Sequence, residues 1–456
     1  AAVAACERVF APWMDLEEKM RSEKIPLFSL ESKAPVKDFD IVAFSVNYEL
    51  NYTNLLNMLD LSGIPLRANQ RAEDHPLVIA GGPCTVNTAP LEAFIDAFVI
   101  GDGEEVILEI VDAYKKVAGC RPVPVCAANG GPGLPVASYV PKFPKEIKRR
   151  IVKDLDNAFY PVKEPVPYIQ IIHDRITLEI MRGCPFDCKF CQTSRLYRPV
   201  RMRSRKKILE LAKEMYRNSG YEEISLLSLS TASYPGIAAL ITELTEGFKE
   251  KGVGISIPSL RSKDVLKTLP SMIAQVRKAG LTFAVESGSE RLRKYIGKDI
   301  DMEEVILACD EAFKSGWRLV KFYFMIGLPT ETKKDLEGIP VFINRVLALK
   351  SGTEVSVSLN AFVPKAGTPF ENEPMDSLDS LFEKQQFLKK ALPRRRVNMK
   401  FSDPKRGLLE WRFNKNNKAL SDVLYAAWKN GAKFDSWREC FRFDIWEDAF
   451  RQSGVD

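Results

Sequence analysis

The stretch RGCPFDCKFC, at residues 182–191, places three cysteines at the spacing CxxxCxxC. It directly follows an apolar run, Thr177–Met181, that we expect to form a strand. Three thiolates at this spacing can wrap an iron–sulfur cluster and leave one iron without a protein ligand. An iron that is open in this way can bind a small molecule, whereas a cluster closed by four cysteines can only hold or pass electrons. We therefore predict an iron–sulfur site at Cys184, Cys188 and Cys191, just beyond the carboxyl end of a strand.

A zinc site is the main structural alternative for these cysteines. Structural zinc usually has four ligands, most often two pairs of Cys or His. The chain has only two histidines, His75 and His173, and Cys120 and Cys126 are too far apart to form a second close pair. The supply of ligands therefore disfavours zinc. The nine cysteines also lack the density of a secreted disulfide framework, which favours a reducing, cytoplasmic setting.

Residues 171–370 alternate apolar strands with amphipathic helices, the pattern of a parallel sheet with crossover helices. We expect strands at Thr177–Met181, Glu223–Leu229, Gly254–Pro258, Thr282–Glu286, Val320–Ile326 and Glu354–Phe362. We expect helices at Arg205–Asn218, Ile237–Lys251, Asp264–Lys278, Glu303–Lys314 and Leu336–Leu349. This order predicts a partial TIM-type (βα)6 barrel, and barrel active sites lie at the carboxyl ends of the strands.

Residues 1–119 show a similar alternation and predict an α/β, Rossmann-like (doubly wound) domain. We expect strands at Arg8–Pro12, Ile41–Val46, Leu77–Ala80 and Ala97–Ile100, and helices at Tyr52–Leu61 and Glu104–Lys116. Such a sheet normally opens with a strand, whereas Ala1–Ala5 is typical of the end of a helix. We therefore expect the first strand to lie upstream of residue 1.

Two further regions complete the predicted organisation. Residues 120–170 are rich in proline and predict an interdomain linker. Residues 371–456 predict a helical C-terminal region, in which Leu420, Val423 and Leu424 mark one buried helix face. No apolar run approaches the roughly eighteen residues of a bilayer-spanning helix, so we expect no membrane association. The net charge of +6 does not by itself indicate nucleic-acid binding.

The cysteine motif, with Phe190 before its last cysteine and a six-unit βα barrel around it, resembles the radical S-adenosylmethionine (SAM) superfamily. The resemblance covers about residues 171–370. It implies that Cys184, Cys188 and Cys191 bind a 4Fe–4S cluster, whose open iron is chelated by the amino and carboxylate groups of SAM. It also implies that the reduced cluster cleaves SAM, or that SAM serves as a methyl donor to a second cofactor.

The superfamily binds SAM at the ends of successive barrel strands, and the resemblance assigns candidates to two of the middle ones. Ser228 and Ser230 end the second strand, where the family usually has Gly-Gly-Glu, so hydroxyls there are a departure. Ser259 and Arg261 end the third strand, and the arginine could pair with the SAM carboxylate in a bidentate way. A packing or surface role is the alternative for each of these residues.

The next two strand ends supply the remaining candidates for SAM binding. Glu286 closes an otherwise apolar strand, and the ribose hydroxyls are its expected partner. Ile326 and Gly327 end the fifth strand and resemble the segment that lines the adenine, where a glycine permits close approach of the backbone. The resemblance also places Phe190, inside the cysteine motif, beside the cofactors.

The N-terminal region has a resemblance of its own. Ser45 ends one strand, Gly81 and Gly82 end another, and Gly101–Glu105 opens a helix, an order similar to the cobalamin-binding domain of one large radical SAM class. In that class the serine and the glycine pair contact the nucleotide tail of cobalamin. The alternative is that these residues only form the tight βα turns of a Rossmann-like sheet.

The sequence therefore predicts a radical SAM enzyme, with cobalamin-dependent methyl transfer as the leading reaction. A cofactor-free N-terminal domain that positions a substrate is one alternative, and a non-catalytic iron–sulfur or RNA-binding protein is another. A methylthiotransferase is less expected, because no second three-cysteine motif is present. The substrate is unknown and could be RNA or protein. The basic run from Arg195 to Lys207 after the motif could guide an anionic substrate such as RNA, but a solvated helix start is the favoured interpretation. The resemblance also implies an electron donor such as flavodoxin or ferredoxin.

Overall fold

The computed structural model describes residues 4–117, 149–169, 171–256, 281–298 and 300–455. The chain divides into two compact units. The first unit comprises Ala1–Val152 and Leu409–Asp456, and the barrel unit comprises Lys153–Leu408. The predicted boundaries after residues 119, 170 and 370 do not coincide with this division and remain predictions. Among the described residues, no helix combines the length and hydropathy needed to cross a bilayer.

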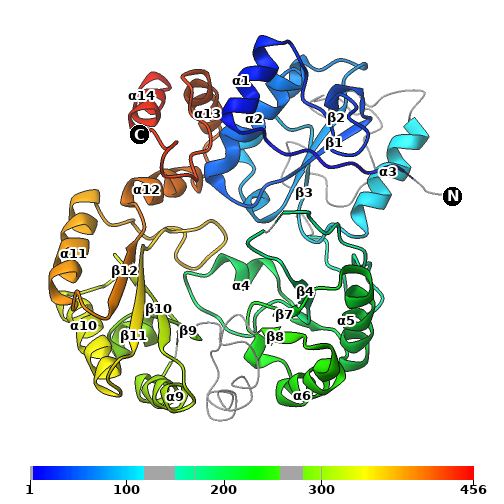
Figure 1. Cartoon of the computed structure of the whole chain (residues 1–456). Coiled ribbons are helices and arrows are strands. Elements are labelled where there is room, and N and C mark those ends of the chain that lie inside the picture. The colour runs from blue at the N-terminus through cyan, green and yellow to red at the C-terminus, as the bar shows by residue number, and fades with distance from the viewer. Residues whose placement is uncertain (1–3, 118–148, 170, 257–280, 299, 456) are drawn as a thin grey trace. The chain divides into compact units, whose positions relative to one another are not determined.

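The first unit contains a three-stranded parallel sheet in the order β1-β2-β3 (Figure 1). Its strands are β1 (Ile41–Ser45), β2 (Leu77–Gly81) and β3 (Ala97–Val99). Its helices are α1 (Met14–Ser22), α2 (Tyr52–Leu61), α3 (Val106–Val117), α13 (Leu420–Lys429) and α14 (Phe443–Gln452). Three predicted strands and both predicted helices are therefore present, in a Rossmann-like arrangement. The C-terminal helices α13 and α14 share a core with α2, in which Leu56, Leu424 and Trp446 are fully buried.

The prediction of a strand at Arg8–Pro12 is wrong. The segment has no regular structure, although Val9 and Phe10 supply the apolar residues of a strand pattern. Its polar groups are used by a neighbouring loop, because the Arg8 carbonyl accepts from the Leu30 N–H at 2.8 Å and the Arg8 N–H donates to Glu31 at 2.7 Å. The segment therefore does not join the sheet.

The barrel unit contains all six predicted strands, in two parallel sheets and with adjusted ends (Figure 1). One sheet has the order β4-β7-β8, with β4 (Ile176–Glu179), β7 (Glu223–Leu227) and β8 (Gly254–Ser256). The other has the order β12-β11-β10-β9, with β9 (Leu281–Glu286), β10 (Leu319–Ile326), β11 (Glu354–Ala361) and β12 (Val397–Phe401). A short antiparallel pair, β5 (Met181–Arg182) and β6 (Arg201–Met202), flanks the cysteine motif. The strand β12 lies in the region predicted to be helical and extends the second sheet.

The helices of the barrel unit follow the strands in the predicted alternation. They are α4 (Gln192–Leu196), α5 (Arg205–Ser219), α6 (Ile237–Phe248), α8 (Glu290–Tyr295), α9 (Met302–Lys314), α10 (Lys333–Ala348) and α11 (Leu378–Ala391), and α12 (Pro404–Phe413) crosses the division between the units. Local sequence sets their ends. Ser204 caps the start of α5 by accepting from the Lys207 N–H, and Gly220 ends it in the left-handed conformation. The predicted helix at Asp264–Lys278 lies outside the described residues.

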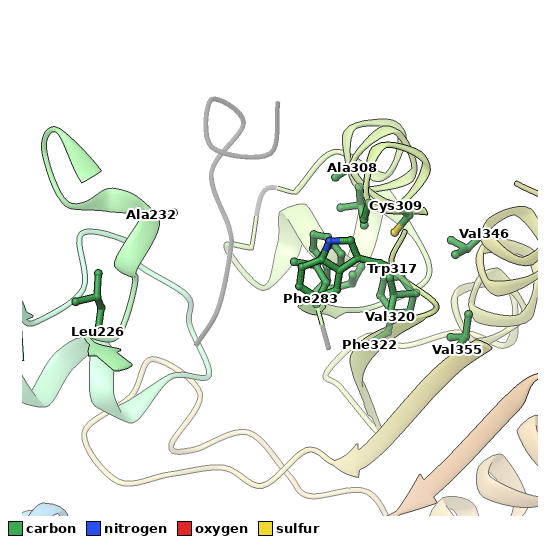
Figure 2. Close-up of a cluster of buried hydrophobic side chains, with 14 of the residues drawn as sticks. Leu226, Ala232, Phe283, Ala308, Cys309, Trp317, Val320, Phe322, Val346 and Val355 are labelled. Carbon is green, nitrogen blue, oxygen red and sulfur yellow. The ribbon is translucent and has the colours of Figure 1, made fainter. Parts of the chain in front are cut away.

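The core of the barrel unit lies between the sheets and these helices. Phe283 of β9 stacks on Phe322 of β10 with ring centroids 5.7 Å apart, and Phe322 meets Phe342 of α10 edge-on at 5.0 Å. Figure 2 shows these strand residues beside Trp317 and the thiol of Cys309. Burial raises the pKa of the Cys309 thiol well above its usual value, so it behaves as an apolar side chain. This packed core holds the strand ends in place.

Candidate active site

The cysteine motif forms a loop between β5 and α4, which we call the cluster loop (residues 183–191). Cys184 and Cys188 are buried and Cys191 is partly buried, and none of the three forms a disulfide. Gly183 opens the loop with a φ of +97°, and a Cβ there would lie 2.5 Å from the Tyr197 carbonyl oxygen. This position therefore requires glycine. The Sγ of Cys191 lies 3.0 Å from the Thr193 hydroxyl, within hydrogen-bonding distance.

The cluster loop rests on the segment that follows α8. The Lys189 N–H donates to the Ile296 carbonyl at 2.9 Å. A Cβ added at Gly297 would lie 2.9 Å from the Asp187 carbonyl oxygen, so the two backbones are in close contact. The Lys189 ammonium also lies 4.7 Å from the centre of the Tyr295 ring. These contacts fix one side of the loop against the end of the second sheet.

The arginines after the cluster loop are mostly used within the barrel unit. Arg195 and Arg198 pair with Asp187 of the loop at 2.6 and 3.4 Å. Arg203 is buried, donates to the Leu155 carbonyl and lies 4.7 Å from the centre of the Tyr160 ring. These three arginines thus support the loop and the fold. Their presence in the sequence is explained by these contacts without an RNA ligand.

The donor set of the cluster loop suits an iron–sulfur cluster better than a single ion. In the described part of the chain, no three His, Cys, Asp or Glu side chains are grouped closely enough to hold one metal ion. A 4Fe–4S cluster instead binds each thiolate to a different iron, so its ligands are spread more widely. Three thiols on one loop, two of them buried and the third partly buried, fit this requirement.

Glu286 ends β9 with an unusual backbone. The register between β9 and β10 shifts by one residue just before it, and its φ is +71°, in the left-handed region that few residues other than glycine adopt. Glu286 is 8% exposed, and its Oε1 accepts from the Lys298 ammonium at 2.8 Å. The same ammonium lies 5.9 Å from the centre of the Phe190 ring. Lys298 thus contacts both the buried carboxylate of Glu286, a residue with a strained backbone, and the Phe190 ring of the cluster loop.

Gly327 follows β10, the neighbour of β9, so it lies at the same sheet end as Glu286. Its φ is +77°, and a Cβ there would lie 2.9 Å from a methyl carbon of Leu381. Its N–H donates to Glu331 at 3.1 Å. Burial raises the pKa of Glu331, although Lys384 binds the same carboxylate at 2.7 Å. The carbonyl of Ile326 accepts from the Phe362 N–H of the next strand end at 2.9 Å.

The two serines after β7 make local contacts. Ser228 lies 3.0 Å from the Thr231 hydroxyl, and Ser230 lies 2.9 Å from the Ser233 hydroxyl. A hydroxyl that makes one such contact can still accept a hydrogen bond from a ligand. Ser259 and Arg261, the candidates after the third strand, lie outside the described residues.

The candidates of the first unit meet at one sheet end. Ser45 and Gly81 are paired in register at the carboxyl ends of β1 and β2, which is the adjacency that the cobalamin resemblance requires. Gly82 has a φ of +113°, and a Cβ there would lie 2.6 Å from the Val46 carbonyl oxygen. The close approach to Val46 therefore explains this glycine without any ligand. At Gly81, by contrast, a Cβ would make an ordinary contact of 3.6 Å with Val99.

A cavity of about 650 Å³ opens beside β1. It is lined by β1, α2, the segment 7–11 and two aromatic residues, Phe434 and Trp437. Ser45 is part of this lining, and so are several asparagines. A volume of this order, with apolar walls and a few polar groups, is usual for small-molecule sites. Tyr48 does not line it; its hydroxyl lies 3.1 Å from the Glu410 carboxylate.

Lys298 is the residue of the site that the sequence did not indicate. It follows Gly297 in a polar stretch, where a lysine is usually solvated, yet it is only 7% exposed. Its partner Glu286 lies twelve positions earlier, on another element. A buried ion pair of this kind is visible only in the folded chain.

Comparisons with known proteins agree with this architecture. The family described as "Radical SAM proteins, N-terminal" matches residues 1–121, and the "Radical SAM superfamily" matches residues 178–343. An uncharacterised protein of Methanocaldococcus jannaschii is 30% identical over 388 residues, which are 84% of this chain and 80% of that protein. An uncharacterised methyltransferase of Pyrococcus horikoshii is 26% identical over 287 residues, covering 60% of this chain and 59% of the relative.

Two solved structures share the fold. The cobalamin-dependent SAM radical enzyme OxsB, with aqua-cobalamin bound, superimposes with a TM-score of 0.52 at 18% identity, over 91% of this chain and 63% of that one. The radical SAM methyltransferase TsrM of Kitasatospora setae, with cobalamin and a [4Fe-4S] cluster bound, gives a TM-score of 0.50 at 12% identity, over 76% and 64%. This chain thus spans somewhat less than two thirds of each structure, and the likeness concerns the fold.

Proposed function

Because the chain belongs to the radical SAM superfamily and is an enzyme of that superfamily, we propose that Cys184, Cys188 and Cys191 bind its 4Fe–4S cluster. This assignment rests on the position of the cluster loop at the end of a barrel strand and on its three thiols, two of them buried and one partly buried, which form no disulfide. When bound, the cluster supplies the electron that cleaves SAM to methionine and a 5′-deoxyadenosyl radical.

The strand ends around the loop provide the groups for SAM. Glu286 accepts hydrogen bonds from the ribose hydroxyls, since its carboxylate is held beside the cluster loop through Lys298. Ile326 and Gly327 line the adenine through their backbone, while Leu381 and Asp376 occupy the space that a side chain at position 327 would take. Phe190 packs against this site from within the loop. Ser228, Ser230, Ser259 and Arg261 contact the amino-acid part of SAM.

The test of this assignment is anaerobic reconstitution with iron and sulfide. We expect the reconstituted chain to bind about four irons and to release 5′-deoxyadenosine from SAM when reduced. The variant Cys188→Ala should lose the cluster and the product, whereas Cys6→Ala, which removes an exposed cysteine of the first unit, should retain both. Equal iron content in the two variants would refute the assignment.

We propose cobalamin-dependent methyl transfer as the reaction. The adjacency of Ser45 and Gly81 and the cavity that Ser45 lines support a cobalamin site in the first unit. The methyltransferase relative and the two cobalamin-containing structures support the same choice. Gly82 adds less support, because Val46 already requires it.

Cobalamin binding is tested by purifying the chain from cells supplied with cobalamin. We expect a corrin absorption spectrum that Ser45→Trp abolishes, since Ser45 lines the cavity. The control Ser22→Trp, at the exposed end of α1, should leave the spectrum unchanged. A colourless wild-type protein that still cleaves SAM would favour the alternative, in which the first unit positions a substrate without a cofactor.

The enzyme also needs a reductant, and we propose a flavodoxin or a ferredoxin in this role. A reduced flavodoxin should support 5′-deoxyadenosine formation in place of dithionite. An RNA or a protein is the proposed substrate class, and methyl incorporation from radiolabelled SAM into either fraction of a cell extract would distinguish them.

A further inference from the structure

Three consecutive residues after α8 connect the cluster loop with the carboxylate proposed to bind SAM. The Ile296 carbonyl accepts from the Lys189 N–H at 2.9 Å, and Gly297 lies directly against the backbone of Asp187. Lys298 then donates to Glu286 at 2.8 Å. One short segment therefore touches both the loop that holds the cysteines and the end of β9.

This segment is itself held firmly. The Lys298 N–H donates to the Arg293 carbonyl at 2.8 Å. The buried Arg293 guanidinium donates to the carbonyls of Ser287 and Ile300, at 3.1 and 3.0 Å. Arg293 thus links the residue after Glu286 to a residue just beyond Lys298. The lysine and the carboxylate are presented to each other by a common backbone frame.

Burying the Lys298–Glu286 ion pair costs free energy, and the packing of the fold does not by itself require this pair. Removing a lysine and a carboxylate from water is unfavourable, and apolar residues of similar volume often give equal stability. Glu286 also adopts a left-handed backbone, which is a further cost in a residue other than glycine. Such costs are typically concentrated at functional sites.

A second carboxylate at a barrel strand end shows what a structural pair looks like. Glu179 ends β4 and binds Arg182 through both oxygens, at 2.8 and 3.0 Å, and Arg203 lies 3.6 Å from Oε2. Both of its oxygens are occupied. At Glu286, among the described residues, only Lys298 donates to the carboxylate, and it does so at Oε1. In the part of the chain that the structure describes, no group donates to Oε2, so this oxygen can accept a hydrogen bond from a ligand.

We infer that Lys298 is a positioning residue that orients the Glu286 carboxylate toward SAM and ties it to the cluster loop. The inference rests on the proposed function, in which Glu286 binds the ribose. Lys298 does not touch SAM itself. It neutralises the buried carboxylate, fixes its rotamer through Oε1, and lies beside the Phe190 ring between two cluster cysteines.

The experiment compares Lys298→Met, Glu286→Gln and the double variant with the wild-type chain after anaerobic reconstitution. Lys294→Met is the matched control, because Lys294 on α8 forms an exposed pair with Glu290. Three quantities are measured: iron per chain, the Kd for SAM by equilibrium dialysis, and the EPR spectrum of the reduced cluster with and without SAM. Lys298→Gln replaces Lys298→Met under the same criteria if the methionine variant misfolds.

We expect Lys298→Met to retain its iron, to bind SAM about tenfold more weakly, and to lose the SAM-dependent change in the EPR spectrum. The double variant should bind SAM within about twofold of Glu286→Gln, since both changes act through one carboxylate. Lys294→Met should match the wild type.

Wild-type SAM affinity and spectrum in Lys298→Met would overturn the inference, and so would effects that multiply in the double variant. Loss of iron from Lys298→Met at an unchanged melting temperature would restrict Lys298 to supporting the loop, and would also overturn it. A wild-type chain without any SAM-dependent spectral change would instead refute the proposed function.

Discussion

The parallel sheet of the first unit and the sheet β12-β11-β10-β9 of the barrel unit differ in the residues at their carboxyl ends. In the first unit, the backbone of Gly82, after β2, lies in close contact with the backbone of Val46, after β1. Ser45, the last residue of β1, is exposed. In the barrel unit, the end of β9 and β10 contains buried charges, among them the pairs Glu286–Lys298 and Glu331–Lys384. Close backbone turns are needed by any sheet of this class, whereas buried charges are costly. The barrel end is therefore the stronger indication of chemistry.

The largest effect is expected at the backbone-built end. Gly82→Ala should lower the free energy of unfolding by about 3 kcal/mol, because the new Cβ would meet the Val46 carbonyl and φ is positive. Gly81→Ala, its matched control, should change it by less than about 0.5 kcal/mol. Urea denaturation measures both. Equal effects would show that backbone approach does not distinguish the two glycines.

The stability contributed by the charged groups at the end of β9 and β10 should depend on pH, and Asp335 is the group at which we expect this dependence. This buried carboxylate caps α10 and binds Ser289 and Arg291, which follow β9. Burial would raise the pKa of Asp335, but the hydrogen bonds from Arg291, Ser289 and Thr332 outweigh it and hold the pKa well below its usual value. A carboxyl with a lowered pKa stabilises the fold above its unfolded pKa of about 3.9, and this contribution is lost as the pH falls toward the folded value.

Asp335→Asn should therefore cost about 2 kcal/mol at pH 7 and progressively less below about pH 4. The difference in unfolding free energy between wild type and variant, followed across this range, measures the effect. A pH-independent difference would contradict a role for the ionised carboxylate.

Glu286→Gln should have a smaller, ligand-specific effect. We expect the Kd for SAM to rise about tenfold, which corresponds to about 1.4 kcal/mol, while the iron content stays at the wild-type value. Glutamine retains the shape of the side chain and loses the charge that pairs with Lys298. Unchanged SAM affinity would exclude the ribose role of Glu286.

The smallest change in stability is expected at Ser45. This side chain is exposed and its only described hydrogen bond is from Asn47 at 3.4 Å, so Ser45→Ala should change the unfolding free energy by less than about 0.5 kcal/mol. If cobalamin binds beside it, the same variant should still reduce the corrin occupancy of the purified protein. Unchanged occupancy would leave Ser45 without a part in cobalamin binding.

Most barrel strands could be predicted because apolar residues, continuous or alternating with polar ones, form short segments between helices and turns. The strand β12 was missed because it lacks a continuous apolar run: only Val397 is buried, Met399 and Phe401 are partly buried, and Asn398 and Lys400 are exposed. The segment Arg8–Pro12 has the opposite pattern, since it is apolar enough for a strand but its backbone bonds to a loop. Both errors arise where tertiary partners, rather than local sequence, decide the structure.

The site could be predicted where one residue departs from its surroundings. Three clustered cysteines and a carboxylate at the end of an apolar strand are such departures. The same rule would also select Glu179, and only the structure shows that arginines occupy both of its oxygens. Lys298 lies in a polar stretch of sequence in which a lysine is ordinary, so its pairing with Glu286 could not be predicted from the sequence.

We propose that the cluster loop holds the cofactor that cleaves SAM. The most direct test of this proposal is the yield of 5′-deoxyadenosine from the anaerobically reconstituted and reduced chain, compared with that of Cys188→Ala. We predict formation of 5′-deoxyadenosine by the wild type and none above background by the variant. Cleavage of SAM by Cys188→Ala at the wild-type yield, or an iron-loaded wild type that leaves SAM intact, would refute this role of the cluster loop.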